Sequence, residues 1–492
     1  MANVQFIRPE LGALLPQYNL IRDAIAGETV IKRQGTTYLP IPNERGNEDP
    51  REQRTRYNSY LKRAVYYNLA RRTLYGLVGQ VFAKDPLIET PPQLDPLISN
   101  ATGAGISLIQ LAKQAVNFSL AYARGGIMVD YPTTDDTGGA TIADLEAGRI
   151  RPTLYVYSPF DIVNWRTIDR GAEEILSLVV IHENYPMFDD GFEISESSQF
   201  RVLRLDESGE YVHEVWREEE PTKATQGKPP ANKKFMPAFI FRPKDASGNA
   251  LREIPFMFMG AENNDVNPDN PSFYDLASLN LAHYRNSADY EESCFVCGQP
   301  TPVATGLTEE WVKNVLNGRL DFGSRGGIPL PAGANATLIQ ASPNTMIKEA
   351  MDAKERQMVA LGAKIVEQKT IQRTATEVAL EAGMENSTLS SVAKNVSTAF
   401  EWALKWAARW IGQADDGVRF ELNTDFAVNR MTSEQRRQLV EEWQKGAITF
   451  NEMRASLRIA GIATVSDEEA RTQIAQDNIE MIGLPVPVNA PE

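Results

Sequence analysis

Cys294 and Cys297 form the one C-x-x-C motif of the chain and are its only cysteines. Cysteines at this spacing bind structural zinc or exchange disulfides. A structural zinc site needs four ligands, and the nearest further candidate, His283, lies on the helix predicted before the motif, with no fourth ligand nearby. A thioredoxin-like motif would open a helix after a strand, whereas this motif closes a helix. We therefore expect two ordinary, partly buried cysteines and no metal.

Two further stretches resemble parts of nucleotide-binding sites. Asp321-Phe322-Gly323 matches the metal-binding triplet of kinases, but the catalytic-loop signature is absent. The glycine-rich stretch 323–333 has no Gly-Lys-Ser/Thr after it and opens no predicted helix, so a surface loop is the better interpretation. The sequence also has no H-E-x-x-H, nucleophile elbow or dinucleotide fingerprint. We expect no enzymatic activity and no cofactor.

Basic and aromatic side chains could serve a second function, the binding of nucleic acid. Arginines and lysines surround the predicted helix in residues 51–72, which would suit nucleic acid, an acidic partner surface or simply solvent. Trp402, Trp406 and Trp410 recur at i+4 spacing and could stack on bases, although core or subunit-interface anchors are the better interpretation.

Composition limits the function classes. The 492 residues carry a formal net charge of -15, with a pI near 5.0, which argues against a protein that grips phosphate backbones. Nucleic acid can still pass close by without being held. No apolar run is long enough to span a bilayer and the first residues lack a signal-peptide core, so we expect a reducing compartment.

The elements that would position these residues change in type along the chain. Residues 51–86 show an amphipathic helical pattern, and a second helix is predicted to end at Gly125-Gly126. From about Arg151 the hydrophobic period becomes 2, which predicts a β-rich layer with a hairpin turn at 206–209, continued by the stretch 254–260.

A long helical region follows. Residues 262–272 read as a loop, and a helix of roughly 25 residues with a narrow apolar side is predicted from Phe273. A compact segment with a short helix between strand-like pieces follows in 300–341. Ser342-Pro343 predicts the start of a helix that runs to about Gln368.

That helix stops without Gly or Pro at Lys369–Arg373 and restarts at a capping box, Thr374-Ala-Thr-Glu377. The restarted pattern runs to Ile411, with Gly383 as the expected bend. Further capping boxes begin at Thr432, Thr449 and Ser466 and predict short helices. Residues 369–373 are thus a polar loop between two long helices.

This order of elements resembles the portal proteins of tailed bacteriophages over most of the chain, from about Tyr57 to Gly461. The likeness is carried by the sequences of residues 57–86, 273–292 and 374–410, none of which is a catalytic motif. The resemblance implies an α+β, multidomain portal-type subunit with a β-rich wing, two long stem helices, a small clip insert, a long kinked helix and a helical C-terminal crown. It implies these boundaries: wing, 1–262; first stem helix, 263–299; clip, 300–341; second stem helix, 342–368; tunnel loop, 369–373; long wing helix and following strand, 374–430; crown and tail, 431–492.

The resemblance also implies a function and its residues. The chain would form a ring, of twelve subunits in this family, at one capsid vertex, through which double-stranded DNA is packaged and ejected. Its partners would be the terminase large subunit, the tail adaptor, and capsid and scaffold proteins, with assembly in the host bacterial cytoplasm and no membrane. Three groups of polar residues would meet DNA or partners: the tunnel loop, Lys369, Thr370, Ile371, Gln372 and Arg373; the channel-lining stem candidates, Lys348, Lys354, Arg356 and Lys364; and the clip candidates, Arg319, Asp321 and Arg325.

Two other hypotheses remain open from the sequence. One is a different head-to-tail adaptor or scaffold-type ring subunit, which would lack a pore loop between paired long helices. The other is a soluble enzyme with an unrecognised site, which a stable monomer with a closed pocket would favour.

Overall fold

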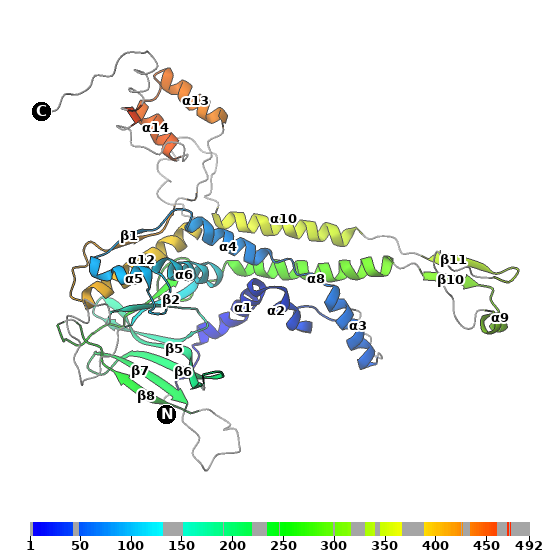
Figure 1. The fold of residues 1–492 in the computed structure, drawn as a ribbon, viewed down its shortest axis with the longest axis horizontal. Helices are drawn as coiled ribbons and strands as arrows, with labels where there is room; N and C mark the ends of the chain where they lie inside the picture. The colour runs from blue at the N-terminus through cyan, green and yellow to red at the C-terminus, as the bar shows by residue number, and fades with distance from the viewer. Residues whose placement is uncertain are drawn as a thin grey trace, which may run out of the picture. The chain divides into compact units, whose positions relative to one another are not determined.

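The computed structural model describes residues 3–42, 49–130, 151–189, 191–218, 234–245, 247–298, 301–315, 330–339, 345–366, 388–424, 426, 433–459, 470, 471 and 473. The fold is mixed α+β, as expected. The chain forms two compact units, Met1–Thr424 and Asp425–Glu492. Unit 1 contains the sheets and the long helices, shown in Figure 1.

Four of the helices described in unit 1 are capped by the side chain of the residue before their first turn: Asp49, Asn68, Ser107 and Thr308. The described helices of unit 1 are α1 (Pro9–Ala26), α2 (Glu28–Arg33), α3 (Pro50–Arg63), α4 (Leu69–Val81), α5 (Asp95–Ser99), α6 (Leu108–Tyr122), α8 (Phe273–Cys297), α9 (Glu309–Asn314), α10 (Met346–Val366) and α12 (Thr388–Trp410), with 3₁₀ turns η1 (Gly35–Thr37) and η2 (Pro92–Leu94). Helices α6 and α12 form the centre of the core, because both bury one broad apolar face against each other and against a sheet.

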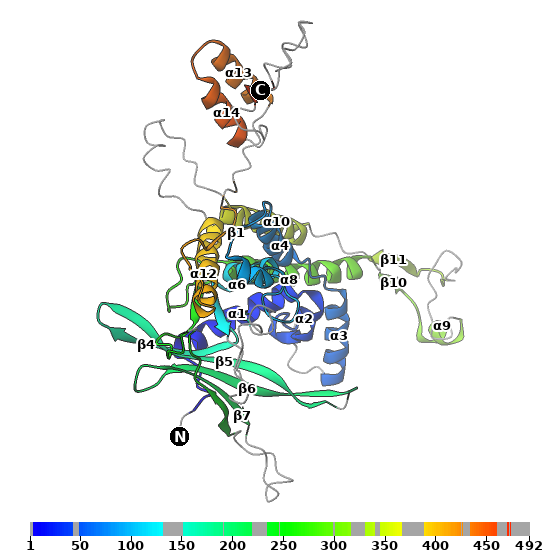
Figure 2. The same cartoon turned by 60° about the vertical axis from the view of Figure 1, so that its left-hand side comes forward.

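The strands form four sheets. A five-stranded antiparallel sheet has the order β4 (Ile162–Arg170), β5 (Glu173–Asp189), β6 (Ile194–Leu205), β7 (Tyr211–Glu218), β8 (Phe235–Phe241), and a three-stranded sheet has the order β3 (Thr153–Tyr157), β2 (Arg124–Asp130), β9 (Phe256–Gly260). The remaining pairs are β1 (Leu87–Glu89) with β12 (Arg419–Glu421), and β10 (Thr301–Thr305) with β11 (Asn335–Ile339). Figure 2 shows the long strands of the five-stranded sheet away from the helices α4, α6 and α8.

The β-rich layer expected from period 2 is confirmed, and so is its hairpin. Asp206 accepts hydrogen bonds from the backbone N–H groups of Ser208 and Glu210, and Gly209 adopts φ 75°, which closes the turn between β6 and β7. The stretch expected to continue that layer instead joins the other sheet. Strand β9 pairs with β2, with Phe256 opposite Met128.

The second helix does not end at Gly125-Gly126. Helix α6 ends at Tyr122, Ala123 adopts the left-handed φ of 54°, and both glycines lie in β2. Gly126 is needed for packing: a Cβ there would overlap the Phe256 ring and lie 2.9 Å from Cδ1 of Ile162. The glycine pair therefore serves close sheet packing, which sequence alone does not separate from a helix stop.

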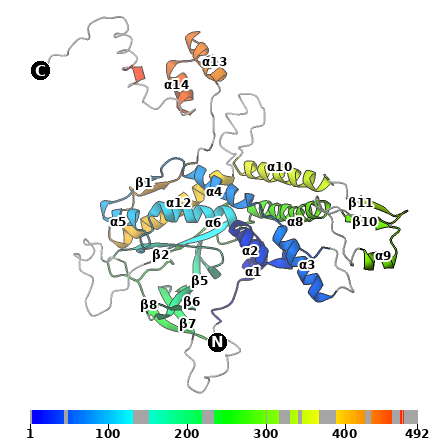
Figure 3. The ribbon, with the colours of Figure 1, turned by 45° about the vertical axis from the view of Figure 1, so that its right-hand side comes forward.

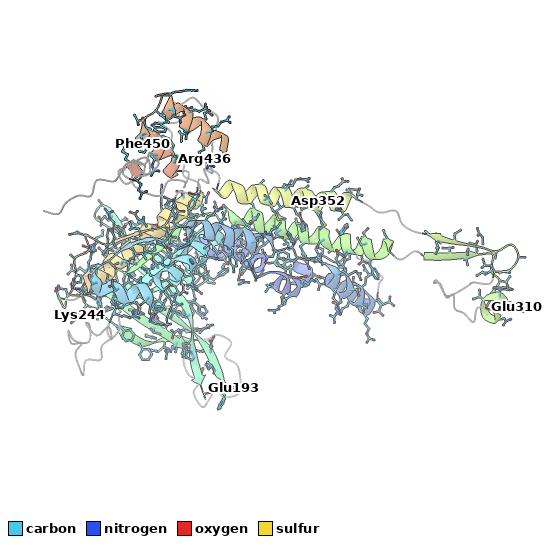
Figure 4. The ribbon with its side chains drawn as sticks, turned by 45° about the horizontal axis from the view of Figure 1, so that its top comes forward. Glu193, Lys244, Glu310, Asp352, Arg436 and Phe450 are labelled. Carbon is cyan, nitrogen blue, oxygen red and sulfur yellow. The ribbon has the colours of Figure 1, made fainter. Side chains whose placement is uncertain are left out.

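Unit 2 contains α13 (Ser433–Gln444) and α14 (Phe450–Ile459). The capping box expected at Thr449 is confirmed, since Glu452 accepts from the Thr449 N–H and donates its own N–H to the Thr449 hydroxyl oxygen. The rings of Trp443 and Phe450 lie 5.9 Å apart and join the two helices; Figure 4 labels Phe450 at the start of α14. Thr432 and Ser466 lie outside the described residues.

Candidate functional site

The candidate site is built on two long helices, α8 and α10, that lie side by side (Figures 1 and 3). Helix α8 leads into β10, and α10 follows β11, the antiparallel partner of β10, so the two helices run in opposite directions. His283 on α8 and Glu355 on α10 face each other, with Nε2 and Oε1 3.4 Å apart. The segment between the helices is short and contains β10, α9 and β11. The sequence pattern predicts two long helices that flank a compact segment, and the structure adds that the two helices pair in an antiparallel arrangement.

Helix α8 matches its predicted range, but its packing is uneven. Nine residues of its first four turns are buried, which is a wider face than the narrow apolar stripe expected: Phe273, Leu276, Ala277, Asn280, Leu281, His283, Tyr284, Ser287 and Ala288. Beyond Ala288 no described residue of α8 is buried. Cys294 is exposed rather than partly buried, and Cys297 is half-buried. Half of the helix is therefore fixed in the body and half extends from it.

The buried half of α8 is fastened by two polar side chains that the sequence analysis missed. The Asn280 side chain accepts a hydrogen bond from the Ala70 N–H at 3.0 Å and donates one to the Tyr67 carbonyl at 2.9 Å. The Ser287 hydroxyl donates to the Val65 carbonyl at 2.6 Å and accepts from the Val65 N–H at 3.2 Å. Together they satisfy four backbone groups, three in the segment between α3 and α4 and the Ala70 N–H in the first turn of α4.

These bonds explain why residues 51–86 do not form one helix. The chain leaves helical geometry after Arg63, and Asn68 starts α4 as its N-cap by accepting from the Arg71 N–H at 2.9 Å. Val65, which lies four residues after Leu61 and four before Leu69 in the amphipathic pattern, is 47 % exposed. The non-helical segment between α3 and α4 is thus stable despite the continuous i+4 pattern, because side chains of α8 form hydrogen bonds with its backbone groups.

Side chains of α3 hold the next turns of α8. Tyr60 donates a hydrogen bond to Asp289 at 2.6 Å, which together with burial raises the pKa of the Tyr60 phenol well above its usual value. Arg63 pairs with Glu292 and lies over the Phe295 ring, 4.3 Å from its centroid. Helix α3 is therefore the support of α8 beyond the buried half.

His283 is nearly buried between the two helices. Burial lowers its pKa, and the nearby Lys354 lowers it further, against the opposing effect of Glu355. The imidazole is therefore neutral near pH 7 and packs as an apolar ring against Tyr67, with centroids 6.4 Å apart. In the described part of the chain no three His, Cys, Asp or Glu side chains are grouped as metal ligands.

Helix α10 presents one narrow side to α8 and the body. The residues that recur at 3- and 4-residue steps lie on that side: Ile347, Met351, Lys354 and Leu361 are half-buried and Met358 is 1 % exposed. Gly362 allows the close approach of α4, since a Cβ there would lie 2.9 Å from Cγ2 of Thr73. The helix begins at Met346, three residues after the predicted start. Thr345, itself a common N-cap residue, accepts the first helical hydrogen bond from Glu349.

The channel-lining candidates fall on different sides of α10. Lys348 and Arg356 are exposed, whereas Lys354 is half-buried near His283, and the side chain of Lys364 lies outside the described residues. Asp352 is also exposed and is labelled in Figure 4. The exposed side of α10 therefore carries both signs of charge.

The remaining candidates cannot be placed. The tunnel-loop residues Lys369, Thr370, Ile371, Gln372 and Arg373, the clip residues Arg319, Asp321 and Arg325, the capping box 374–377 and Gly383 all lie outside the described residues. The elements around them match the sequence pattern in type: Thr308 is the N-cap of α9, its hydroxyl accepting a hydrogen bond from the Trp311 N–H, and α12 ends at Trp410.

The tryptophans of α12 pack within the chain. Trp406 is 9 % exposed and its ring lies 5.9 Å from that of Trp402. Trp410 donates a hydrogen bond from Nε1 to the Lys244 carbonyl at 3.1 Å. These contacts favour the core interpretation over base stacking.

A second polar cluster joins the two larger sheets and was also missed. Arg201 on β6 donates hydrogen bonds to Asp130 on β2 at 2.8 Å and to Glu183 on β5 at 3.0 Å, and Tyr157 on β3 donates to Glu183 at 2.7 Å. His213 on β7 lies beside Arg201, and burial with the Arg201 charge lowers its pKa to about 4. The cluster ties the sheets together. Its members are too far apart in sequence for any local pattern to show them.

Comparison with known proteins gives one family match. A family described as a domain of unknown function (DUF4055) matches residues 272–411. This range starts one residue before α8 and ends one residue after α12, so it covers the helix pair, its insert and α12. A comparison with curated proteins gives no significant match.

Solved structures give low similarities. A chain of a structure described as the virion of a native gene transfer agent (GTA) particle has 14 % sequence identity and a TM-score of 0.38, with 93 % of this chain and 99 % of that chain covered. A chain of the neck of an empty GTA particle, computed with C6 symmetry, has 13 % identity and a TM-score of 0.39, covering 85 % and 91 %. TM-scores this low do not establish a shared fold. Within the described residues, no helix is both long and apolar enough to cross a bilayer.

Proposed function

We propose that the chain is a structural, non-enzymatic component of a phage-like virion, and specifically the portal subunit. Its ring at one capsid vertex would let double-stranded DNA enter and leave, and would dock the terminase motor and later the tail adaptor. The observation that carries the proposal is the antiparallel α8–α10 pair with a small β10–α9–β11 insert between its helices. In this proposal the pair is the stem and the insert is the clip.

The distribution of charge on the exposed side of α10 supports a role in lining a channel for DNA. Four described charged side chains are exposed there, two cations and two anions: Lys348, Arg356, Glu349 and Asp352. A wall with balanced charge on an acidic chain does not hold a phosphate backbone tightly, so DNA can slide past it. The loop residues Lys369 and Arg373 would supply the weak local contacts.

Electron microscopy of the purified full-length chain tests the ring. Rings with a central hole are the expected result, and monodisperse monomers under all conditions would refute the proposal. Rings that form but neither bind a terminase large subunit nor support packaging would favour another head-to-tail adaptor.

A double substitution, Lys369→Ala with Arg373→Ala, tests the loop. It should leave rings intact and reduce DNA packaging or retention, because only the weak contacts with DNA are removed. The matched control, Arg436→Ala with Lys445→Ala, removes the same charge from two exposed positions, one in α13 and one directly after it, and should change neither. Loss of rings in the loop variant alone would mean that the loop is a structural element.

A further inference from the structure

Helix α3 carries a polar stripe that its own chain leaves exposed. Six residues at 3- and 4-residue steps share this side of the helix, and each is exposed: Arg51, Arg54, Thr55, Asn58, Ser59 and Lys62. The opposite side is fixed to the body by Tyr57 and Tyr60, which are 9 % and 3 % exposed. Figures 1 and 3 show α3 beside α8.

The stripe is strongly basic in an acidic chain. Helix α3 holds five cationic side chains and one acidic one, Glu52, whereas the whole chain has a formal net charge of -15. The side chains of Arg51, Arg54 and Lys62 form no ion pair with any described residue. Like charges one turn apart repel each other, so the uncompensated stripe does not favour folding of the helix by itself.

The residue types of the stripe favour nucleic acid as its partner. Guanidinium, ammonium, hydroxyl and amide groups are those that bind phosphate and sugar oxygens in nucleic-acid complexes. A protein interface would have an apolar or aromatic centre, and the stripe contains no apolar side chain. A hollow of about 380 Å³ beside the stripe is lined by five residues that each carry a polar or charged group: Arg51, Glu52, Thr55, Arg56 and Ser59.

We propose that this stripe of α3 binds the phosphate backbone of double-stranded DNA without reading its sequence. The contact lies on a helix outside the α8–α10 pair, so it is additional to the passage of DNA through the proposed channel, and it does not require a ring. Arg51, Arg54 and Lys62, which form no ion pair within the described part of the chain, supply the attraction, and the hydroxyl and amide groups hold the DNA backbone against the helix.

The salt dependence of DNA binding tests this contact. Three neutralised phosphates give a slope of log K against log salt of about -2.7, which is about 40-fold weaker binding at 200 mM than at 50 mM salt. We expect the triple variant Arg51→Gln, Arg54→Gln, Lys62→Gln to have a slope shallower by about that amount, measured by fluorescence anisotropy with a ~20-bp duplex of arbitrary sequence. If the triple variant fails to fold, Arg54→Gln alone should reduce the slope by about 0.9.

The control variant removes the same charge from exposed positions on and near β4: Arg166→Gln, Arg170→Gln, Arg252→Gln. It should keep the wild-type slope, because only the total charge changes. Equal slopes for wild type and the α3 variant, or no duplex binding by wild type, would overturn the proposal. So would loss of self-association in the α3 variant with an unchanged slope, because the stripe would then be a protein interface.

Discussion

Replacing Asn280 by leucine should detach the break between α3 and α4 from α8. The Asn280 side chain is 0 % exposed and satisfies the Ala70 N–H and the Tyr67 carbonyl, at 3.0 and 2.9 Å. Leucine has a similar volume, so the substitution leaves no large cavity. It removes both hydrogen bonds and gives these backbone groups no new partner.

The expected loss follows mainly from the Ala70 N–H. The Tyr67 carbonyl still accepts a hydrogen bond from the Leu69 N–H at 2.9 Å, so it is not left unsatisfied. An unsatisfied buried donor costs about 1–3 kcal/mol and a lost hydrogen bond about 0.5–1.5 kcal/mol, while the extra apolar surface of leucine offsets about 1 kcal/mol. We therefore expect the free energy of unfolding to fall by about 1–3 kcal/mol, since Ala70 is fully buried and water cannot replace the lost acceptor.

Urea unfolding followed by tryptophan fluorescence measures the total change, and hydrogen exchange of the amides in residues 64–70 measures it locally. The matched control is Asn286→Leu, a half-buried asparagine on the same helix for which no hydrogen bond to the described residues is found. If Asn280→Leu stays within about 0.5 kcal/mol of this control, the fastening role of Asn280 is wrong.

Two further predictions concern packing and pH. Gly79→Ala should stabilise α4 by about 0.5–1 kcal/mol in thermal unfolding, because a Cβ there meets nothing within 4 Å, whereas Gly126→Ala should destabilise the chain, because its Cβ overlaps Phe256. The pKa of His213 falls from 6.5 to about 4 on folding, so the unfolded chain binds the extra proton between those values and stability declines as pH falls through that window. Between pH 7 and pH 4.5, wild type should therefore lose about 2 kcal/mol more than His213→Asn in urea unfolding; an equal loss would contradict a buried neutral imidazole.

The sequence predicts those elements whose signals are local. Helix α8 has its predicted range, the turn at 206–209 closes the β6–β7 hairpin, and Thr449 caps α14. Each depends on periodicity, a turn residue or a cap within a few positions, so no distant contact is needed to fix it.

The corrections come from contacts between segments far apart in sequence. Asn280 and Ser287 stabilise the backbone break that divides residues 51–86, more than 200 positions earlier in the chain. Gly126 leaves room for the ring of Phe256, which lies on the neighbouring strand β9 at the far end of the β-rich region. A helical pattern and a glycine pair are each compatible with several local conformations, and tertiary contacts determine which one forms.

In the candidate site, too, the features with local sequence signals could be predicted and those set by distant contacts could not. The two strong helical patterns that flank a compact segment predict α8 and α10 as separate long helices, and the structure shows that these helices pack against each other. The side on which each cation lies does not follow: Lys354 faces His283, whereas Lys348 and Arg356 face outward. The roles of residues 369–373 remain predictions from the sequence.

The uneven packing of α8 bears on the proposed function. Its first half is fixed by buried side chains and by Asn280 and Ser287, but Phe295 and Val296 are 46 % and 56 % exposed. On α10, Val359 is 64 % exposed. A monomer gains nothing by leaving these apolar groups in water, whereas a ring can cover them with the helices of neighbouring subunits. We infer that the buried part of α8 orients the helix pair. In the proposed portal ring, neighbouring subunits would cover the exposed apolar side chains of the pair.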